Sequence, residues 1–167
     1  MRPPSRLGWI AVWAAVLGGC AHYSTSAGLI GGIRSVGIPI AENETAEFDI
    51  GELLSERAGD AYTSDGKLRV VDEESADALL QLKVISLEDR PFTYTATEQT
   101  EQYRFSLLVD VALVRVADES RLLELERLEG WGTYDASLDD EEGRDQAVET
   151  ALDMIIEEIV DRTTASW

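Results

Sequence analysis

Few residues of this 167-residue chain have side chains suited to catalysis or metal binding. Cys20 is the only cysteine and His22 the only histidine, which excludes an internal disulfide, a Cys/His zinc site and most histidine-dependent catalysis. The acidic runs at 72–74 and 139–142 lack the alternating ligands and central glycine of a calcium-binding EF-hand loop. No GxSxG, P-loop or GxGxxG motif is present in the sequence. The sequence therefore predicts a protein that is not an enzyme and uses no metal or cofactor.

The position of Cys20 indicates a specific chemistry for its thiol. A basic start with Arg2 and Arg6 precedes an apolar run over 7–17, which is shorter than a membrane-spanning helix and typical of a signal peptide. The run is followed by Leu-Gly-Gly-Cys at 17–20, which resembles the bacterial lipobox. In that motif a peptidase cuts before the cysteine, and the thiol carries an acyl group. The sequence predicts lipidation of Cys20, and the alternative is a free thiol on a core helix.

This interpretation of Cys20 divides the chain into three expected parts. Residues 1–19 are expected to be a lipoprotein signal peptide that is cleaved, and residues 20–32 to be a lipidated tether. Residues 33–167 are expected to form a single domain. Several acyl chains, each contributing ~0.8 kcal/mol per buried methylene, would make the anchor effectively permanent.

The charge of the chain limits its partners. There are 33 acidic residues against 14 Lys and Arg, which gives a formal net charge of −19 at pH 7. Such a surface repels the phosphates of nucleic acids, so a nucleic-acid function is disfavoured. The hydrophobic fraction of 44% is typical of a globular domain, which argues against wholesale disorder.

The hydrophobic pattern predicts an ordered series of strands and helices. The expected strands cover 33–40, 68–71, 78–87, 103–116 and 122–134, and the expected helices cover about 47–62 and 139–163. The strand over 103–116 alternates strictly, with apolar residues at Tyr103 and then at every second position to Leu113. Residues 42–45 are expected to be a turn in which Asn43 or Thr45 caps the first helix. This order predicts a two-layer α+β sandwich, with two helices packed on one face of a mixed sheet of about four or five strands.

Two aromatic residues near the end of the last strand have two interpretations. Trp131 and Tyr134 either bind a partner or close the core of the sheet. The sequence leaves both open.

Several short stretches occur in an order that resembles a known family. They are Tyr23-Ser24-Thr25, Val36-Gly37-Ile38-Pro39-Ile40, Glu42-Asn43-Glu44-Thr45, Asp65 to Val71, Ala76 to Leu80, Arg90 to Tyr94 and Gln102-Tyr103-Arg104. Trp131, Tyr134 and an amphipathic C-terminal helix follow them. Behind a lipobox, this order is similar to the LPS-assembly lipoprotein family (LptE-type), over essentially residues 20–163.

The resemblance implies a non-enzymatic function at the outer membrane. Such lipoproteins sit on its periplasmic face, held by a lipid anchor, and insert into an LPS-translocon β-barrel (LptD-type). There they support assembly of the barrel and assist lipopolysaccharide delivery to the outer leaflet. The resemblance implies Cys20 as the lipidated residue, and Arg90 and Arg104 are the basic candidates for contact with lipopolysaccharide or a partner. The alternative function is an outer-membrane regulatory lipoprotein that activates a periplasmic cell-wall synthase.

Overall fold

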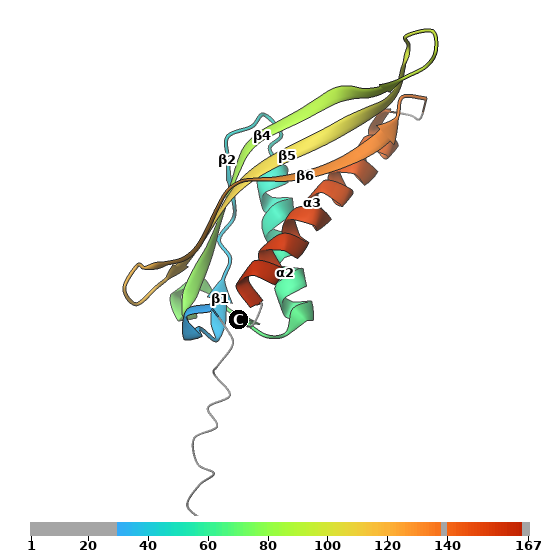
Figure 1. The fold of residues 1–167 in the computed structure, drawn as a ribbon. Coiled ribbons are helices and arrows are strands. Elements are labelled where there is room, and N and C mark those ends of the chain that lie inside the picture. Colours follow the sequence, from blue (N-terminus) through green and yellow to red (C-terminus); the bar gives the residue numbers. More distant parts are fainter. Residues whose placement is uncertain (1–29, 138–139, 165–167) are drawn as a thin grey trace, which may run out of the picture.

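A computed structural model of the chain describes residues 30–137 and 140–164, and Figure 1 shows its fold. Cys20, the expected signal peptide over 1–19 and most of the expected tether over 20–32 lie outside the described residues. The elements follow in the order η1 (Ile30–Gly32), β1 (Ser35–Gly37), β2 (Glu42–Asn43), α2 (Ile50–Asp65), β3 (Arg69–Val70), η2 (Glu73–Ser75), β4 (Ala78–Tyr94), β5 (Thr100–Arg115), β6 (Arg121–Asp135) and α3 (Asp140–Thr164).

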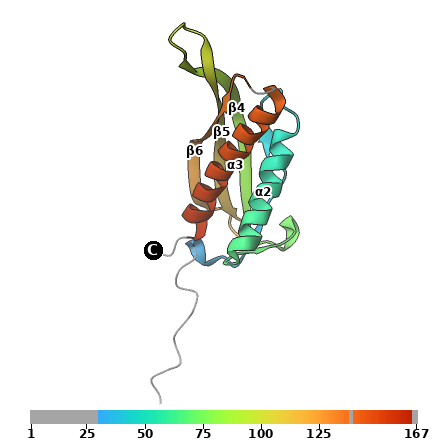
Figure 2. The same ribbon diagram turned by 90° about the vertical axis from the view of Figure 1, so that its right-hand side faces the viewer.

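The strands form one mixed sheet in the order β3-β1-β4-β5-β6, and β2 pairs separately with β4. The pairs among β1, β2, β3 and β4 are parallel, whereas β4, β5 and β6 pair antiparallel over nearly their whole lengths. Helices α2 and α3 lie side by side on one face of this sheet, and no helix of residues 30–137 or 140–164 lies on the other face (Figures 1 and 2). The predicted α+β two-layer sandwich is confirmed.

The core lies between the helices and the sheet, and every second residue of β5 contributes a buried side chain to it. Phe105, Leu107, Val109, Val111 and Leu113 are almost fully buried, whereas the residues between them are only half-buried. The α3 helix completes the core with a continuous stripe of buried side chains: Ala147, Val148, Ala151, Leu152, Ile155, Ile156 and Ile159. The predicted division of β5 into a buried face and an outer face is thereby confirmed.

The α3 helix lies unusually close to the edge strand β6 because of two glycines. A Cβ atom at Gly130 would lie 2.0 Å from the carbonyl oxygen of Ala151, and one at Gly132 would lie 2.4 Å from that of Ala147. Only glycine allows the helix backbone to approach the strand this closely. The two glycines therefore fix where α3 crosses the sheet.

Three local expectations were wrong. Glu42 and Asn43 form β2 instead of part of a turn, because they pair with Lys83 and Val84 of β4, and the sheet therefore has six strands. The N-cap of α2 is Asp49, which makes no capping side-chain bond. Asn43 instead accepts hydrogen bonds from the backbone N–H and the hydroxyl of Thr45 in the preceding loop. β4 continues seven residues beyond the expected end at Leu87, because its partner β5 extends alongside it.

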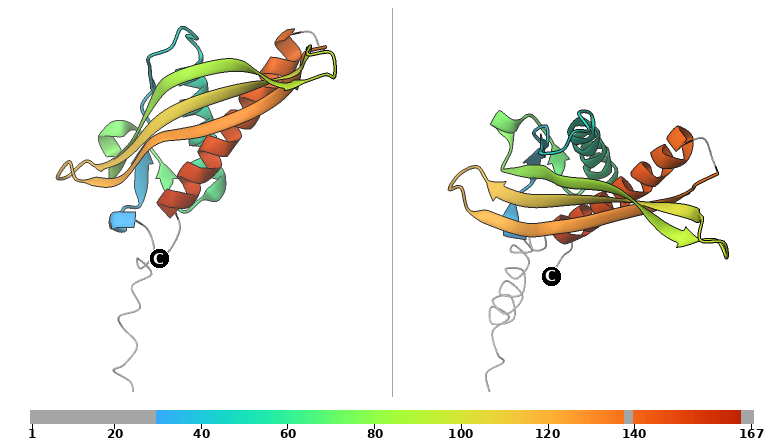
Figure 3. Two further views of the ribbon diagram at one scale, coloured as in Figure 1. Left: turned by 45° about the horizontal axis from the view of Figure 1, so that its top comes forward. Right: turned by 90° about the horizontal axis from the view of Figure 1, so that it is seen from above.

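The long strands give the sheet two distinct ends. Residue 30 and the C-terminal end of α3 lie near each other, whereas the β4–β5 hairpin projects at the opposite end (Figures 1 and 3). The 17 residues of β4, at about 3.3 Å each, make the sheet roughly 50 Å long. A ligand at the hairpin end would thus lie far from the point where the described chain begins.

Candidate binding surface

The uncovered face of the sheet is the candidate functional surface, and we call it the open face. It is formed by the side chains of β4, β5 and β6 that point away from the helices, such as Ser106, Leu108 and Asp110 of β5. None of the described helices covers this face (Figure 1), so a partner could approach its side chains. Both of the basic residues singled out from the sequence lie on it.

The structure brings Arg90 and Arg104 together. The two residues are direct cross-strand partners in the β4–β5 ladder, at the hairpin end of the open face. The side chain of Arg90 is 74% exposed and forms an ion pair with Glu88. Two guanidinium groups therefore lie side by side on neighbouring strands, with one carboxylate next to each of them, Glu88 at Arg90 and Glu129 at Arg104.

Aromatic rings hold the guanidinium of Arg104 in place. Its Cζ atom lies 4.2 Å from the ring centroid of Trp131 and 5.7 Å from that of Phe92. These distances are within the range of cation–π attraction. Nη2 lies 3.8 Å from a carboxylate oxygen of Glu129, while Nε is enclosed and has no hydrogen-bond acceptor. We refer to Arg90, Phe92, Arg104 and Trp131 as the arginine–aromatic cluster.

The cluster has the composition of a site for an anionic group on an apolar carrier. A guanidinium recognises carboxylate and phosphate oxygens through paired N–H donors. Phe92 and Trp131 are 47% and 37% exposed, so apolar surface surrounds the charged groups. Because the aromatic rings already hold the guanidinium of Arg104 in one orientation, its Nη groups can bind such an oxygen with little loss of side-chain entropy.

Trp131 and Tyr134, for which the sequence left two interpretations open, lie on opposite faces of the sheet. Trp131 lies on the open face beside Arg104, whereas Tyr134 lies on the helix side and stacks on Tyr103 with a centroid separation of 5.5 Å. The sequence did not identify Phe92 as a neighbour of Arg104. Phe92 is two residues after Arg90, and in a regular strand this spacing would predict that both side chains lie on the same face. The ladder is irregular between Pro91 and Thr93, so the spacing alone does not settle the face of Phe92.

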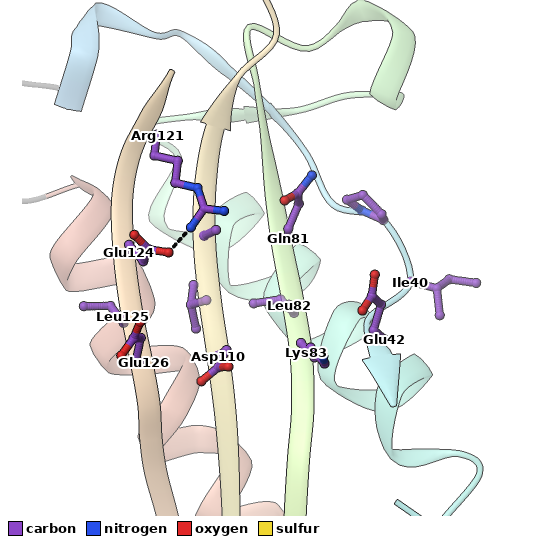
Figure 4. Close-up of a pocket in the computed structure, with 13 residues that line it drawn as sticks. Ile40, Glu42, Gln81, Leu82, Lys83, Asp110, Arg121, Glu124, Leu125 and Glu126 are labelled. Atoms are coloured by element: carbon purple, nitrogen blue, oxygen red, sulfur yellow. Dashed lines mark hydrogen bonds and ion pairs between the residues drawn. The ribbon is translucent and has the colours of Figure 1, made fainter. Parts of the chain in front are cut away.

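A second feature of the open face is a hollow of about 370 Å³ towards the β5–β6 hairpin end of the sheet. Figure 4 shows it between Ile40 and Glu42 on one side and the side chains of β6 on the other. Its basic residues are paired within the chain: Arg121 contacts Glu124, and Nζ of Lys83 lies 2.7 Å from Glu44, which raises the pKa of Lys83. Four carboxylates line the hollow against these two basic groups, so it is less suited to an anionic ligand than the arginine–aromatic cluster.

The helix side of the sheet uses its arginine differently. Arg144 of α3 donates to both carboxylate oxygens of Glu47 at 3.0 and 3.1 Å, and through Nε to Asp89 at 3.0 Å. The hydrogen bonds to Glu47 are the main reason that the pKa of Arg144 is raised. Because these contacts join α3, β4 and the loop before α2, this cluster stabilises the fold rather than offering a site.

The two layers also differ in charge. Helices α2 and α3 together contain 13 acidic and three basic residues. Arg57 of α2 bridges to Glu149 and Asp153 of α3 at 2.7 and 3.6 Å, so little basic charge remains free on that side. The helix layer is therefore a strongly acidic surface, and the arginine–aromatic cluster lies on the opposite side of the sheet.

Two further observations concern the described part of the chain. None of its helices is long and apolar enough to cross a membrane. Within the same residues, no group of three or more His, Cys, Asp or Glu side chains is placed to hold a metal ion.

Comparisons with known proteins identify related sequences and folds. The family model LptE, described as lipopolysaccharide-assembly, matches residues 33–163. No curated protein matches the chain. Protein XCC0632 from Xanthomonas campestris has a similar structure with a TM-score of 0.60 and 13% identity, over 78% of this chain and 83% of that one. The hypothetical protein CT253 from Chlamydia trachomatis gives 0.53 and 11%, over 77% and 94% of the two chains. A minor lipoprotein from Acinetobacter baumannii gives 0.50 and 13%, over 78% and 90%. At these identities the likeness shows the fold alone.

Proposed function

Because the chain belongs to the LptE family of lipopolysaccharide-assembly proteins, we propose that it is an outer-membrane lipoprotein that plugs an LPS-translocon β-barrel. In this function it supports assembly of the barrel and assists delivery of lipopolysaccharide to the outer leaflet. The observation that carries the proposal is the family match, which spans the folded domain from the first residues of the sheet to the end of α3. The family is one of non-enzymatic lipoproteins, and the sequence likewise predicts no catalytic residues.

The proposed anchor is an acylated Cys20, on the periplasmic face of the outer membrane. Ile30 lies ten positions after Cys20, and this tether spans at most about 35 Å when fully extended. The domain would therefore stay close to the membrane that holds it. We expect Cys20→Ala to move the protein from the membrane fraction to the soluble periplasmic fraction. If the variant remains tightly bound to the membrane, the anchor does not depend on Cys20.

The charge of the helix layer supports a place inside a barrel whose lumen is basic. Thirteen acidic side chains on two adjacent helices would find complementary charge there. In the same arrangement the open face, with Arg90 and Arg104, is left for the anionic groups of lipopolysaccharide or for a carboxylate of the partner. The tests below distinguish these two uses of the arginine–aromatic cluster.

The first experiment is isolation of the full-length protein from outer membranes with mild detergent. We expect a β-barrel of the lipopolysaccharide-export class to copurify, and depletion of the protein to lower lipopolysaccharide at the cell surface. Copurification of a cell-wall synthase without such a barrel would overturn the proposal and favour the regulatory lipoprotein.

The second experiment concerns the cluster. Arg90→Gln combined with Arg104→Gln should weaken capture of purified lipopolysaccharide by about tenfold, since two charge-assisted contacts are lost. Arg121→Gln, on the open face but outside the cluster, is the matched control. Unchanged lipopolysaccharide capture together with weaker barrel copurification would assign the two arginines to the partner instead.

A further inference from the structure

Besides the two-residue strand β2, which pairs only with β4, the sheet has three free edges along its described strands, and two of these three are protected against pairing. β3 has only two residues, Arg69 and Val70. The edge of β4 beyond Val84 carries an irregularity at 84–86, three consecutive charged residues at 88–90 and then Pro91. Short strands, bulges, charges and proline are the usual means of preventing an edge strand from recruiting another strand.

The third edge, along β6, is protected over only half of its length. The first half carries Arg121, Glu124, Glu126 and Arg127, and Arg127 has a positive φ of 54° at a ladder irregularity. The second half, from Leu128 to Asp135, pairs with β5 without interruption and contains neither proline nor lysine. Its only charged residues are Glu129 and Asp135. This half is a straight free edge that lacks the protection seen elsewhere in the sheet.

The register shows which backbone groups of this edge are unused. The N–H of Ala136 donates to the carbonyl of Glu101 at 3.0 Å, and the pairing continues without a shift from Asp135 back to Leu128. Because hydrogen bonding alternates along an antiparallel strand, Glu129, Trp131 and Thr133 direct their N–H and C=O groups away from β5. All three residues are exposed, and β6 has no described strand partner other than β5.

The free edge has exposed apolar side chains in both layers. Trp131 lies on the open face and is 37% exposed. On the helix side, Met154 follows Ala147 and Ala151 by seven and three residues, so it lies on the stripe of α3 that faces β6. Met154 is nevertheless 39% exposed. A strand added to this edge would cover both side chains.

We propose that the edge of β6 from Leu128 to Asp135 pairs with an extended segment of the β-barrel partner that lies outside the closed barrel wall, and that this segment carries basic residues. The identity of the partner rests on the proposed function. Backbone hydrogen bonds to Glu129, Trp131 and Thr133 supply the affinity, as in other cases of strand addition. The basic character follows from Glu129, from Asp135 and from the acidic helix layer, all of which would repel an acidic strand. The net charge of −19 also disfavours a second copy of this chain as the occupant.

The test removes one outward N–H without changing the bonds to β5. Thr133→Pro deletes the donor and places a ring at the free edge, where proline is tolerated in a strand. Thr133→Ala is the matched control, because it removes the same side chain and keeps the N–H. We expect Thr133→Pro to copurify about tenfold less barrel than the wild-type protein, and Thr133→Ala to copurify as much, since one hydrogen bond and the close approach are lost.

Each other outcome is decisive. If Thr133→Pro retains the barrel at the wild-type level, strand addition at this edge is wrong, while the proposed function stands. If the wild-type protein brings down no barrel, the proposed function fails and this inference fails with it. If Thr133→Pro lowers the melting temperature strongly, Glu129→Pro and its control Glu129→Ala test strand addition at a second outward position. The amount of copurified barrel is again the measurement.

Discussion

The two faces of one sheet each hold an arginine against an aromatic ring, and the two arginines differ in what their N–H groups do. Arg144, on the helix side, lies 5.3 Å from the ring centroid of Phe105 and donates to two carboxylates from separate elements. Arg104, on the open face, lies over Trp131 with an Nε that has no acceptor. The donors of Arg144 are occupied within the fold, whereas the carboxylate nearest the guanidinium of Arg104, that of Glu129, lies 3.8 Å from Nη2.

This difference extends to the whole of each face. On the helix side, packing sets the identity of nearly every residue, down to the two glycines that admit α3. The open face mixes charged, polar and apolar side chains, such as Asp110, Ser106 and Leu108, and no described element packs against it as a second layer. One face of an antiparallel sheet is commonly open to solvent, and such a face is available to a partner or ligand. The following predictions test whether the division between a structural face and a binding face is as sharp as proposed.

The largest effect is expected at the contact between β6 and α3. Gly130→Val would place a Cβ 2.0 Å from a backbone carbonyl of Ala151, which cannot rotate away. The helix must move, so we expect a loss of about 4 kcal/mol, above the 1–3 kcal/mol of ordinary overpacking. Urea unfolding measures this loss. Thr133→Val, on the open face of the same strand, is the control and should change stability by less than about 0.5 kcal/mol. Equal losses at both positions would show that the faces do not differ.

Adjacent residues of β5 give the most direct comparison of the faces. Leu107 is fully buried against the helices, while Leu108 points to the open face and is half-buried. Leu107→Ala should cost about 3 kcal/mol because it leaves a cavity in the core, and Leu108→Ala should cost less than about 1 kcal/mol. Thermal or urea unfolding of the two variants checks this prediction. A cost at Leu108 as large as that at Leu107 would require the open face to be packed.

A buried tyrosine on the helix side predicts a dependence on pH. Thr163 donates its hydroxyl proton to the carbonyl of Ile159, so the hydroxyl of Tyr62 donates to Thr163 at 2.5 Å. Burial raises the pKa of Tyr62 to about 12, above its ordinary value of 10. The neutral phenol is therefore favoured by folding, and its contribution is complete below pH 10 and lost as the pH rises towards 12. We expect about 2 kcal/mol to be lost by pH 12.

The matched variant for this prediction is Tyr62→Phe. It has no ionisable group, so the stability advantage of the wild-type protein over this variant should shrink and then reverse across pH 10 to 12. It should also cost about 1 kcal/mol at neutral pH through the lost hydrogen bond. Parallel pH profiles for the two proteins would contradict the assignment of a raised pKa to Tyr62.

The sequence was sufficient for the features that depend on periodicity. Alternation over 103–116 predicted which side of β5 is buried, and the apolar stripe of α3 predicted the helix that covers it. The sequence was insufficient where strand pairing in the folded protein overrides the local preference for secondary structure. Glu42 and Asn43 form a strand because β4 offers an edge beside them, and charged residues 88–90 stay in a strand because β5 holds them there.

The candidate site shows the same limit. Arg90 and Arg104 were both identified from the sequence, but their direct pairing depends on the irregular register of the β4–β5 ladder. The placement of Trp131 on the open face depends on the bulge at Glu126 and Arg127, which shifts the alternation of β6. A bulge changes which face a residue occupies, and no local pattern in the sequence indicates where it occurs.

The smallest effect, and the one closest to function, is expected from exchanging each arginine for glutamine. Arg144→Gln should cost about 1 kcal/mol, because its side chain is only 25% exposed and it joins Glu47 and Asp89. Arg104→Gln should cost less than about 0.5 kcal/mol, because the lost cation–π contact is offset by release of a buried Nε without an acceptor. Urea unfolding at low and high salt measures both, and only the Arg144 variant should lose its difference from wild type as salt rises. In assays of lipopolysaccharide capture and barrel copurification the order of the two effects should reverse, and Arg104→Gln should bind less than Arg144→Gln. If Arg104→Gln destabilises the fold more than Arg144→Gln does, then Arg104 has a structural role. The main argument for a binding function of the open face would then be wrong.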